Sequence, residues 1–438
     1  MIKAERRLIL FGRYPVVGRA KTRLITRLGP LGAADLHRRL SERALDTFIA
    51  TRLAPVRFSY SDASPARMRR WLAGRTVDIH PQEPGELGRR MQCALAQALR
   101  QGARQVVLAG TDIPDLSPRI LSQAFAALAE HDVVLGPSLD GGYYLVGVRR
   151  PVPIFDDMPW GSAQVLALTL DAARRNALSI SLLKPLGDVD RPEDLSRLPA
   201  EWRMDPYLSV VIPTLNESDA IGPTLARFDS RRADMEVIVA DGGSRDGTAA
   251  LARSAGARVT VTSPGRAGQQ NAGAALARGG VLLFLHADTH LPQDFDAQIF
   301  EALIDAGVTL GAFRFRTDYD HRGMRLVERM VGLRASVLRL PYGDQALFLR
   351  NQVFRRLGGF PDVPIAEDLL LVRRVLKTGR LALAPGYAVT SGRRWRSMGL
   401  LRTTMINYAI AAGCFLGVPP SRMAPLYSGS RGFPGKPR

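Results

Sequence analysis

Two aspartates in this sequence each follow a short, unbroken apolar run. Asp288 comes after Val281–Leu285, and Asp112 comes after Val106–Ala109 with Pro114 close behind. Such runs are typical of strands buried on both faces of a parallel sheet, and ligands bind beyond the carboxyl ends of those strands. A carboxylate at that place can hold a divalent cation, which in turn can hold a diphosphate. The alternative is that Asp288 or Thr289 caps a helix that starts near Pro292.

The segments that lead to these two aspartates resemble each other. Residues 91–99 and 270–277 both predict small-residue helices, and each is followed by a glycine-bearing turn, an apolar strand and the aspartate. The shared position of the aspartate favours an internal repeat over a chance likeness. We therefore expect an α/β protein with two tandem domains, residues 1–205 and 206–438, each with a mostly parallel sheet flanked by helices.

The first predicted strand, Leu8–Phe11, runs into a basic loop that contains Lys21 and Arg23. Cations and backbone N–H groups in such a loop would suit a diphosphate or triphosphate, and the alternative is a solvated basic turn. The loop lacks the GxGxxG fingerprint, which argues against a dinucleotide site. Asp140 precedes two glycines that would let a ligand approach, although it also fits an ordinary turn. Asp190 precedes a helix that begins with proline.

Composition narrows the classes of function. The chain has 438 residues, a formal net charge of +19 and two distant cysteines, Cys93 and Cys414. The basic residues are spread along the whole chain without a block interleaved with aromatics, so we expect no nucleic-acid partner. The cysteine spacing predicts neither a zinc site nor a disulfide framework. The N-terminus runs directly into a strand with no signal segment, which predicts a cytoplasmic protein.

Residues 6–198 resemble a bacterial family of unknown function within the nucleotide-diphospho-sugar transferase superfamily. The resemblance rests on five features, which are Lys21–Leu24, Gly110–Pro114, Asp140–Leu145, Trp160 and Asp188–Asp190. The loop is also similar to that of phospholactate guanylyltransferases. The resemblance implies that Asp112 and Asp190 flank a metal-bound nucleotide, and it leaves the activity open.

The second half resembles the family 2 glycosyltransferases of the GT-A fold over nearly its whole length. The motifs that carry the resemblance are Pro213–Glu217, Asp241–Thr248, Gly265–Asn271, His286–Asp288 and Glu367–Asp368. Within that family the sequence is most similar to a subgroup named for arsenosugar biosynthesis. One departure is that the usual Asp-x-Asp motif reads His286-Ala287-Asp288 in this chain.

This second resemblance implies a role for each matching residue. Asp288 would bind Mg²⁺ or Mn²⁺, and His286 would either add a ligand or face the core. Asp368 is the expected general base and Asp344 the second candidate. Glu367 and Asp368 would equally suit the N-terminus of a helix. The residues expected to bind the donor nucleotide are Pro213, Thr214, Glu217, Asp241, Arg266, Asn271, Arg394 and Trp395.

The resemblance thus implies a metal-dependent, inverting transfer of a sugar from a nucleotide-diphospho-sugar to a hydroxyl of a small-molecule or lipid acceptor. The first half would be either a nucleotidyltransferase that makes the donor or a non-catalytic nucleotide-binding module. The last helix, predicted over Leu400–Val418, is short and impure for a membrane span. It would pack on the domain, form a dimer contact, or lie on a membrane surface as a peripheral contact. We expect the tail from Ser428 to be disordered.

Overall fold

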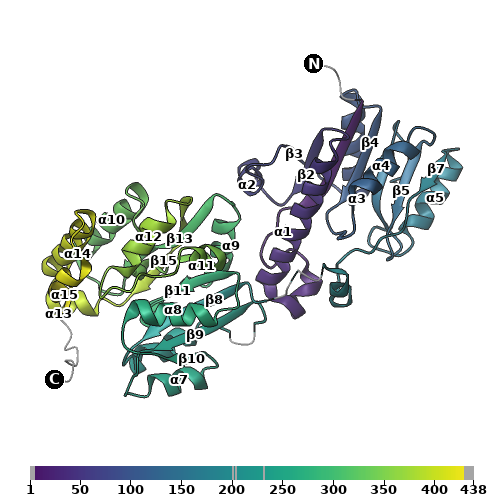
Figure 1. Ribbon diagram of the computed structural model, residues 1–438. Helices are drawn as coiled ribbons and strands as arrows, with labels where there is room; N and C mark the ends of the chain where they lie inside the picture. The colour runs from purple at the N-terminus through teal and green to yellow at the C-terminus, as the bar shows by residue number, and fades with distance from the viewer. Residues whose placement is uncertain (1–4, 200–201, 203–204, 230–231, 429–438) are drawn as a thin grey trace. The chain divides into compact units, whose positions relative to one another are not determined.

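The computed structural model describes residues 5–199, 202, 205–229 and 232–428. The chain forms two compact units, residues 1–204 and 205–438, and each is described by itself (Figure 1). Residues 200, 201, 203 and 204, next to the predicted domain boundary at residue 205, and the tail beyond Ser428 lie outside the described residues.

The first unit is built on a seven-stranded sheet of order β3-β2-β1-β4-β6-β5-β7. β6 runs antiparallel to both of its neighbours, and the other pairs are parallel. The strands are β1 (Arg6–Arg13), β2 (Val56–Ser61), β3 (Asp78–Pro81), β4 (Gln105–Gly110), β5 (Val133–Pro137), β6 (Tyr143–Val148) and β7 (Ile180–Leu182). The helices are η1 (Thr22–Leu24), α1 (Ile25–Thr51), α2 (Pro65–Trp71), α3 (Leu87–Arg100), α4 (Pro118–Ala127), α5 (Val165–Arg175) and η2 (Pro192–Arg197).

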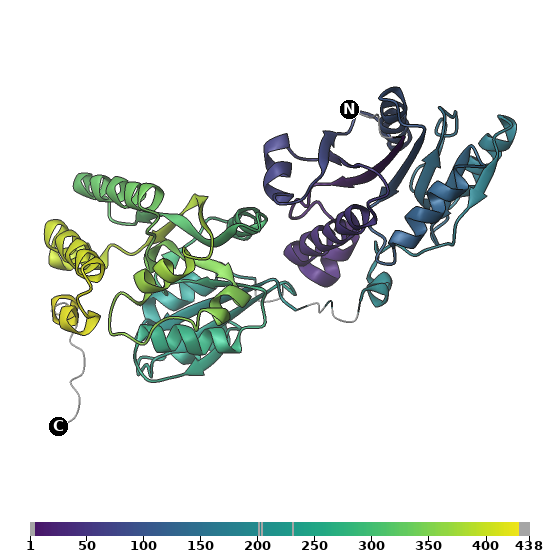
Figure 2. The same ribbon diagram turned by 45° about the horizontal axis from the view of Figure 1, so that its top comes forward.

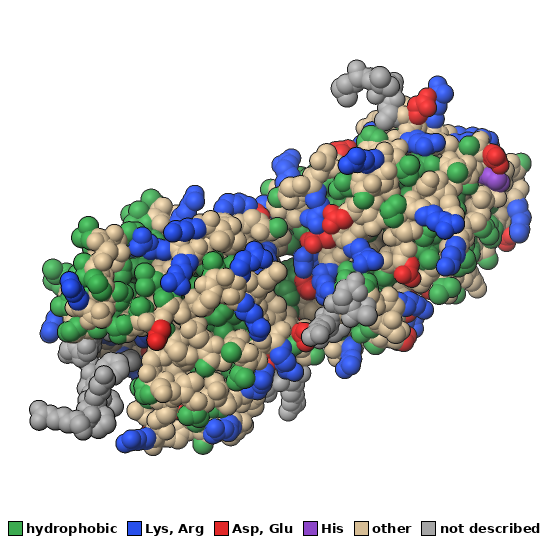
Figure 3. All heavy atoms as spheres, viewed as in Figure 1, with side chains coloured by type: hydrophobic (Ala, Val, Ile, Leu, Met, Phe, Trp, Pro, Cys, Tyr) green, Lys and Arg blue, Asp and Glu red, His purple; other side chains and the backbone are tan. Residues whose placement is uncertain are grey.

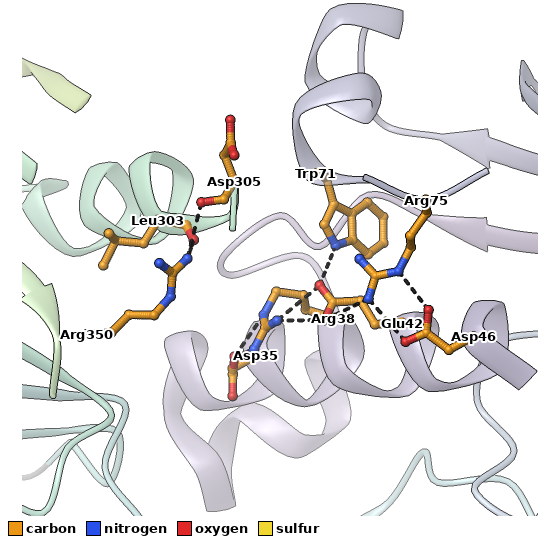
Figure 4. Close-up of polar contacts among 9 residues, drawn as sticks. All are labelled: Asp35, Arg38, Glu42, Asp46, Trp71, Arg75, Leu303, Asp305 and Arg350. Carbon is orange, nitrogen blue, oxygen red and sulfur yellow. Dashed lines mark hydrogen bonds and ion pairs between the residues drawn. The ribbon is translucent and has the colours of Figure 1, made fainter. Parts of the chain in front are cut away.

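Side chains from α3 and α5 form one core with the sheet, and residues of α1 form a second core with Leu24 and Val189. A polar network joins α1 to α2 and to the residues that follow α2. Glu42 accepts hydrogen bonds from Trp71 Nε1 at 2.8 Å and from Arg38, and Arg75 donates to Asp46 (Figure 4). These contacts hold the helix that follows the basic loop.

The second unit is built on an eight-stranded sheet of order β10-β9-β8-β11-β14-β13-β15-β12. β14 runs antiparallel to both neighbours, and β12 runs antiparallel to β15. The strands are β8 (Leu208–Thr214), β9 (Met235–Asp241), β10 (Arg258–Val261), β11 (Val281–Phe284), β12 (Thr289–His290), β13 (Val308–Thr317), β14 (Phe348–Arg350) and β15 (Arg380–Thr390). The Arg350 guanidinium ties β14 to the carbonyl of Leu303 (Figure 4).

Helices cover this sheet on both faces (Figure 2). They are α6 (Ser218–Leu225), α7 (Thr248–Ser254), α8 (Arg266–Leu276), α9 (Phe295–Leu303), α10 (Arg322–Val337), η3 (Gly343–Gln345), α11 (Asn351–Arg356), α12 (Glu367–Val375), α13 (Arg393–Met398), α14 (Leu400–Phe415) and α15 (Pro420–Ser428). One core of this unit brings the inner side chains of α8, α12 and α14 against β11 and β14.

Apart from β12, the two sheets have the same strand order and the same strand directions. β1 corresponds to β8, β4 to β11, and β7 to β15. Asp112 and Asp288 therefore follow equivalent strands, as the internal repeat predicted. The predicted fold class, two α/β units with mostly parallel sheets flanked by helices, is confirmed.

Two of the open alternatives about helix ends are settled. The helix after Pro292 begins at Phe295 with Asp294 as its N-cap residue, so Asp288 is not its cap. Helix α12 begins at Glu367 and its N-cap residue is Ala366. Glu367 and Asp368 thus lie in the first turn, where acidic side chains suit the helix dipole, but neither is the capping residue.

The last predicted helix is found as α14, and its inner side packs on the domain through Ile410 and Cys414. Within the described part of the chain, no helix combines the length and the apolar character that crossing a membrane requires.

Candidate functional site

The loop after β9 is organised around Asp241. Its buried carboxylate accepts hydrogen bonds from the hydroxyls of Thr214 at 3.0 Å and Ser244 at 2.5 Å. The backbone N–H groups of Gly243 and Ser244 donate to its second oxygen. Asp241 therefore fixes the loop against the end of β8, next to Pro213.

Asp246 supports the same loop, and the sequence analysis did not single it out. Its carboxylate accepts hydrogen bonds from Ser218 N–H at 3.0 Å and from the N–H and hydroxyl of Thr248. These hydrogen bonds, led by the one from the Thr248 hydroxyl, hold the pKa of Asp246 well below its usual range. Thr248 Oγ1 in turn accepts from the N–H of Glu217 at 2.9 Å, which fixes the backbone at Glu217. The signal in the sequence is the Asp-Gly-Thr at the start of a helix.

Arg393 joins two carboxylates that come from distant parts of the sequence. Its Nη2 lies 2.8 Å from Oδ2 of Asp288, and its Nη1 lies 3.0 Å from Oε2 of Glu217. The antiparallel pairing of β12 with β15 places Thr289 opposite Thr390, and Ser391 N–H donates to the Asp288 carbonyl. This pairing brings the segment after β15 to the carboxylate after β11. The hydrogen bond to Glu217 is the main cause that raises the pKa of Arg393.

Asp368 is held by two backbone donors. Gly343 N–H donates to Oδ2 at 2.6 Å, and Leu369 N–H donates to Oδ1 at 2.7 Å. A Cβ atom at position 343 would lie 3.1 Å from Asp368 Oδ2 and 3.3 Å from His286 Nε2. The absence of a side chain at Gly343 thus permits the close approach of these three groups.

Asp344 and Glu367 are acidic groups in an environment that disfavours their charge. Burial is the main cause that raises the pKa of Asp344 to about 6; Arg334 and Arg266 oppose the rise, and the negative charge of Asp368 adds to it. Asp344 Oδ1 is buried and has no hydrogen-bond partner among the described residues. Burial likewise raises the pKa of Glu367, and Arg266, at 3.6 Å, opposes this effect.

Asn271 and Trp395, two residues expected to bind the donor, make contacts that hold the fold together. The side-chain amide of Asn271 donates to the Phe360 carbonyl and accepts from the Phe360 N–H, both at 2.9 Å. Trp395 is buried in an apolar cluster with Phe315, Met324 and residues of α10, because its large ring anchors α13 to the domain. Arg394, its neighbour on α13, is partly buried.

The acidic groups of this unit do not form a closed metal cage. Among the residues that the structure describes, no three Asp, Glu, His or Cys side chains gather closely enough to hold a metal ion. Mg²⁺ and Mn²⁺ fit such an open site, because Mg²⁺ commonly binds through one or two carboxylates and completes its shell with substrate phosphates and water. Asp288, with hard oxygen donors at a strand end, meets that requirement.

The first unit places a lysine at the equivalent strand end. Lys21 is buried with a left-handed backbone (φ 49°), and its Nζ lies 2.8 Å from Oδ2 of Asp112 and 3.9 Å from Oδ1 of Asp190. The same Nζ donates to the Val189 carbonyl at 2.5 Å. Burial on its own raises the pKa of Asp112, but Lys21 and His37 outweigh it and hold that pKa well below the usual range.

The remaining candidates of the first unit surround this pair. Arg23 forms an ion pair with Asp190. Asp140 is exposed and accepts a hydrogen bond from Gly142 N–H at 3.0 Å, as a turn residue does. Burial, with the charge of Asp140 as the next cause, raises the pKa of Asp188. The structure thus brings Lys21, Arg23, Asp112 and Asp190 together.

Each of the two units contains a segment that matches a known protein family. Residues 209–360 match the family model described as Glycosyl transferase family 2, and residues 44–162 match a family described as an uncharacterised protein conserved in bacteria (DUF2064). A curated 2-phospho-L-lactate guanylyltransferase of Methanopyrus kandleri is 33% identical over 124 residues, which are 27% of this chain. The chain spans 63% of the length of that relative.

Solved structures are similar to parts of the chain. A protein assigned to the nucleotide-diphospho-sugar transferases, from Desulfovibrio desulfuricans G20, is 34% identical and covers 43% of this chain and 83% of its own, with a TM-score of 0.41. A mannosyltransferase of Pyrobaculum calidifontis, in complex with GDP-Man and Mn²⁺, is 21% identical and covers 51% and 69%, with a TM-score of 0.39. Glucosyl-3-phosphoglycerate synthase of Mycobacterium tuberculosis, in complex with Mn²⁺, UDP and its product, is 21% identical and covers 49% and 82%, with a TM-score of 0.37. The two family matches show that the chain joins a DUF2064 unit to a glycosyl transferase family 2 unit, and that its second unit is a family 2 glycosyltransferase.

Proposed function

We propose that the second unit transfers a sugar from a nucleotide-diphospho-sugar to a hydroxyl group of an acceptor, with inversion at the sugar carbon. The observation that carries this proposal is the position of Asp368. The carboxylate is fixed by Gly343 N–H at 2.6 Å, and a Cβ atom at Gly343 would lie 3.1 Å from this carboxylate and 3.3 Å from Nε2 of His286, two residues before Asp288. A base for the acceptor and a carboxylate for the diphosphate thus come from neighbouring segments.

Asp288 would hold a divalent cation, which neutralises the negative charge that develops on the departing diphosphate. The loop fixed by Asp241 and Asp246 would receive the nucleotide, with Glu217 at its edge. Arg393 lies beside Glu217 and Asp288, and Arg266 lies 3.6 Å from Glu367. Both guanidinium groups suit phosphate oxygens.

Asp368 would take the proton from the acceptor hydroxyl. Each of its oxygens accepts one backbone hydrogen bond and keeps a lone pair for that proton. The second candidate is Asp344, because burial raises its pKa to about 6, close to the value that suits a general base near neutral pH.

Turnover of the two asparagine variants distinguishes these bases. Asp368→Asn should lower turnover by roughly 10²-fold or more, with little change in donor affinity, because asparagine keeps the shape but cannot accept the proton. Nucleoside diphosphate release from a panel of nucleotide sugars, including UDP-GlcNAc and GDP-Man, would measure it. Asp362→Asn, on an exposed loop, is the control. Normal turnover of Asp368→Asn together with an inactive Asp344→Asn would assign the base to Asp344.

For the first unit we propose a nucleotide site at Lys21, Arg23, Asp112 and Asp190. Two cations and two carboxylates at one sheet edge favour phosphate and metal over a solvated turn. Pyrophosphate release from a nucleoside triphosphate and a sugar phosphate would identify a nucleotidyltransferase. Nucleotide binding without pyrophosphate release would identify a non-catalytic binding module.

A further inference from the structure

Helix α10 has an apolar face that the rest of the unit leaves uncovered. Four large hydrophobic side chains recur at helical spacing and are each 39–65% exposed, namely Leu326, Met330, Leu333 and Val337. The opposite side of the same helix packs Met324, Val327 and Val331 against Trp395. A helix that is apolar on both sides is normally buried on both sides. We therefore expect the exposed side of α10 to contact another molecule.

Helix α14 continues this surface. It exposes Leu401 and Met405, and Leu416 follows directly after its last residue; each of the three is at least 70% exposed, while Ile410 and Cys414 face the core. The two helices lie against each other where a Cβ at Gly323 would meet Leu400. Figure 3 shows hydrophobic side chains gathered over the end of the unit where α10 and α14 lie. We call this surface, formed by the exposed residues of α10 and α14, the α10–α14 face.

Positive charge surrounds the α10–α14 face. The exposed arginines on and beside the two helices are Arg322, Arg329, Arg339, Arg402 and Arg422. The acidic residue of α10, Glu328, is paired with Arg325 at 2.9 Å. From Ser391 to the last residue the sequence contains no Asp or Glu. Asp320, just before α10, also pairs with Arg325, at 3.3 Å. The exposed arginines on and beside the two helices therefore outnumber the acidic groups next to them.

We propose that the α10–α14 face binds the surface of an anionic lipid bilayer. The leucines and methionines would enter the boundary between headgroups and acyl chains, and the arginines would contact headgroup phosphates, as in interfacial amphipathic helices. Helix α14, with 16 residues, would lie along the bilayer surface and would not cross the bilayer.

The charge of the α10–α14 face makes a second copy of the chain an unfavourable partner for it. A two-fold interface places the same patch of each copy against the other, so the arginines of the rim would face the arginines of the partner. An anionic bilayer instead meets both properties of the face, the apolar centre and the cationic rim.

Flotation of the full chain with phosphatidylcholine vesicles, with and without phosphatidylglycerol, tests this proposal. The wild type should float with vesicles that contain phosphatidylglycerol and remain behind with phosphatidylcholine alone. Leu326→Glu combined with Leu333→Glu should reduce the bound fraction at least tenfold, because it puts two negative charges into the apolar centre. Leu251→Glu, the same change at an exposed leucine of α7, should bind like the wild type. Arg322→Gln with Arg329→Gln should weaken binding and reduce its sensitivity to salt.

Three results would overturn the proposal: a wild type that does not float, a double variant that floats as well as the wild type, or a wild-type dimer that the double variant dissociates. Thermal unfolding verifies that the double variant is folded, and Met405→Glu on α14 replaces it if it is not. The readout is independent of sugar transfer, so its failure leaves the proposed function untouched.

Discussion

Arg393 Nη2 lies 2.8 Å from Asp288 Oδ2, across 105 residues of sequence. The equivalent pair in the first unit is Lys21 with Asp112, also at 2.8 Å. In the first unit the cation follows the first strand, whereas in the second unit it follows β15, the equivalent of β7. In both units, the aspartate that follows the equivalent strand is paired with a basic side chain. That side chain comes from the N-terminal part of the first unit and from the C-terminal part of the second.

The first prediction concerns Arg393→Met. Removal of the guanidinium frees the charge of Asp288 and Glu217, so Mn²⁺ alone should bind about fivefold more tightly, the equivalent of ~1 kcal/mol for a partly exposed ion pair. The affinity for Mn²⁺ with a nucleoside diphosphate should fall by roughly tenfold or more, because a charged hydrogen-bond donor to phosphate is lost. Calorimetric titration would measure both affinities.

A matched control lies on the same helix. Arg396 is 48% exposed against 50% for Arg393, and it forms an ion pair with Asp318 at the same distance of 2.8 Å. Arg396→Met should leave both affinities unchanged. Equal effects of the two variants would show that general charge, and not the position of Arg393, controls binding.

Asp288→Ala is the second prediction. It removes the proposed hard oxygen ligand at the end of β11, so metal-dependent binding of nucleotide sugars should be lost. Asp294→Ala, at the N-cap of α9, should retain that binding. A folded Asp288→Ala protein whose affinity still depends on Mn²⁺ as in the wild type would exclude Asp288 as a ligand.

The sequence predicted the buried strands correctly, because their signal lies within a few consecutive residues. The apolar runs at Val106–Ala109 and Val281–Leu285 became β4 and β11 because side chains buried on both faces leave a continuous hydrophobic signal. The two-residue strand β12 carries no such signal. The contact of Arg393 with Glu217 across 176 residues depends on the pairing of β12 with β15. The resemblance named Trp395 as a donor-binding residue, but the sequence does not reveal that its ring is buried against Phe315 and α10.

The third prediction is an effect of pH on stability at Asp344. Burial raises the pKa of Asp344 from 3.8 to about 6, so the folded protein binds this proton more tightly than the unfolded chain does. Ionisation of Asp344 therefore lowers the free energy of unfolding. The loss begins as the pH rises above 3.8 and is complete above about 6. Asp344→Asn should raise the free energy of unfolding at pH 7 by up to about 3 kcal/mol, and the gain should vanish below about pH 4. Chemical denaturation at both pH values would measure this, and a gain that persists at pH 4 would contradict it.

The fourth prediction concerns the division of the chain. A fragment that starts at Asp205 contains the whole second sheet, its cores and the proposed donor site. It should therefore fold by itself and bind nucleotide sugars with the affinity of the full chain. Circular dichroism and calorimetry would show both properties. An insoluble fragment, or one that does not bind the donor, would mean that the two halves depend on a common core or a composite site.

The last prediction tests the first unit through Lys21. Its ammonium is buried between Asp112, Asp190 and the Val189 carbonyl, where it stabilises two carboxylates at one sheet edge. Lys21→Met keeps most of the aliphatic length and removes the charge, so the affinity for a nucleoside triphosphate should fall at least tenfold. Lys184→Met, at an exposed lysine of the same unit, should bind as the wild type does. Because methionine leaves Asp112 without its main cationic neighbour, the pKa of Asp112 should also rise, and NMR titration of its carboxyl carbon would follow that rise. Unchanged nucleotide affinity together with a raised pKa would show that Lys21 serves the fold alone.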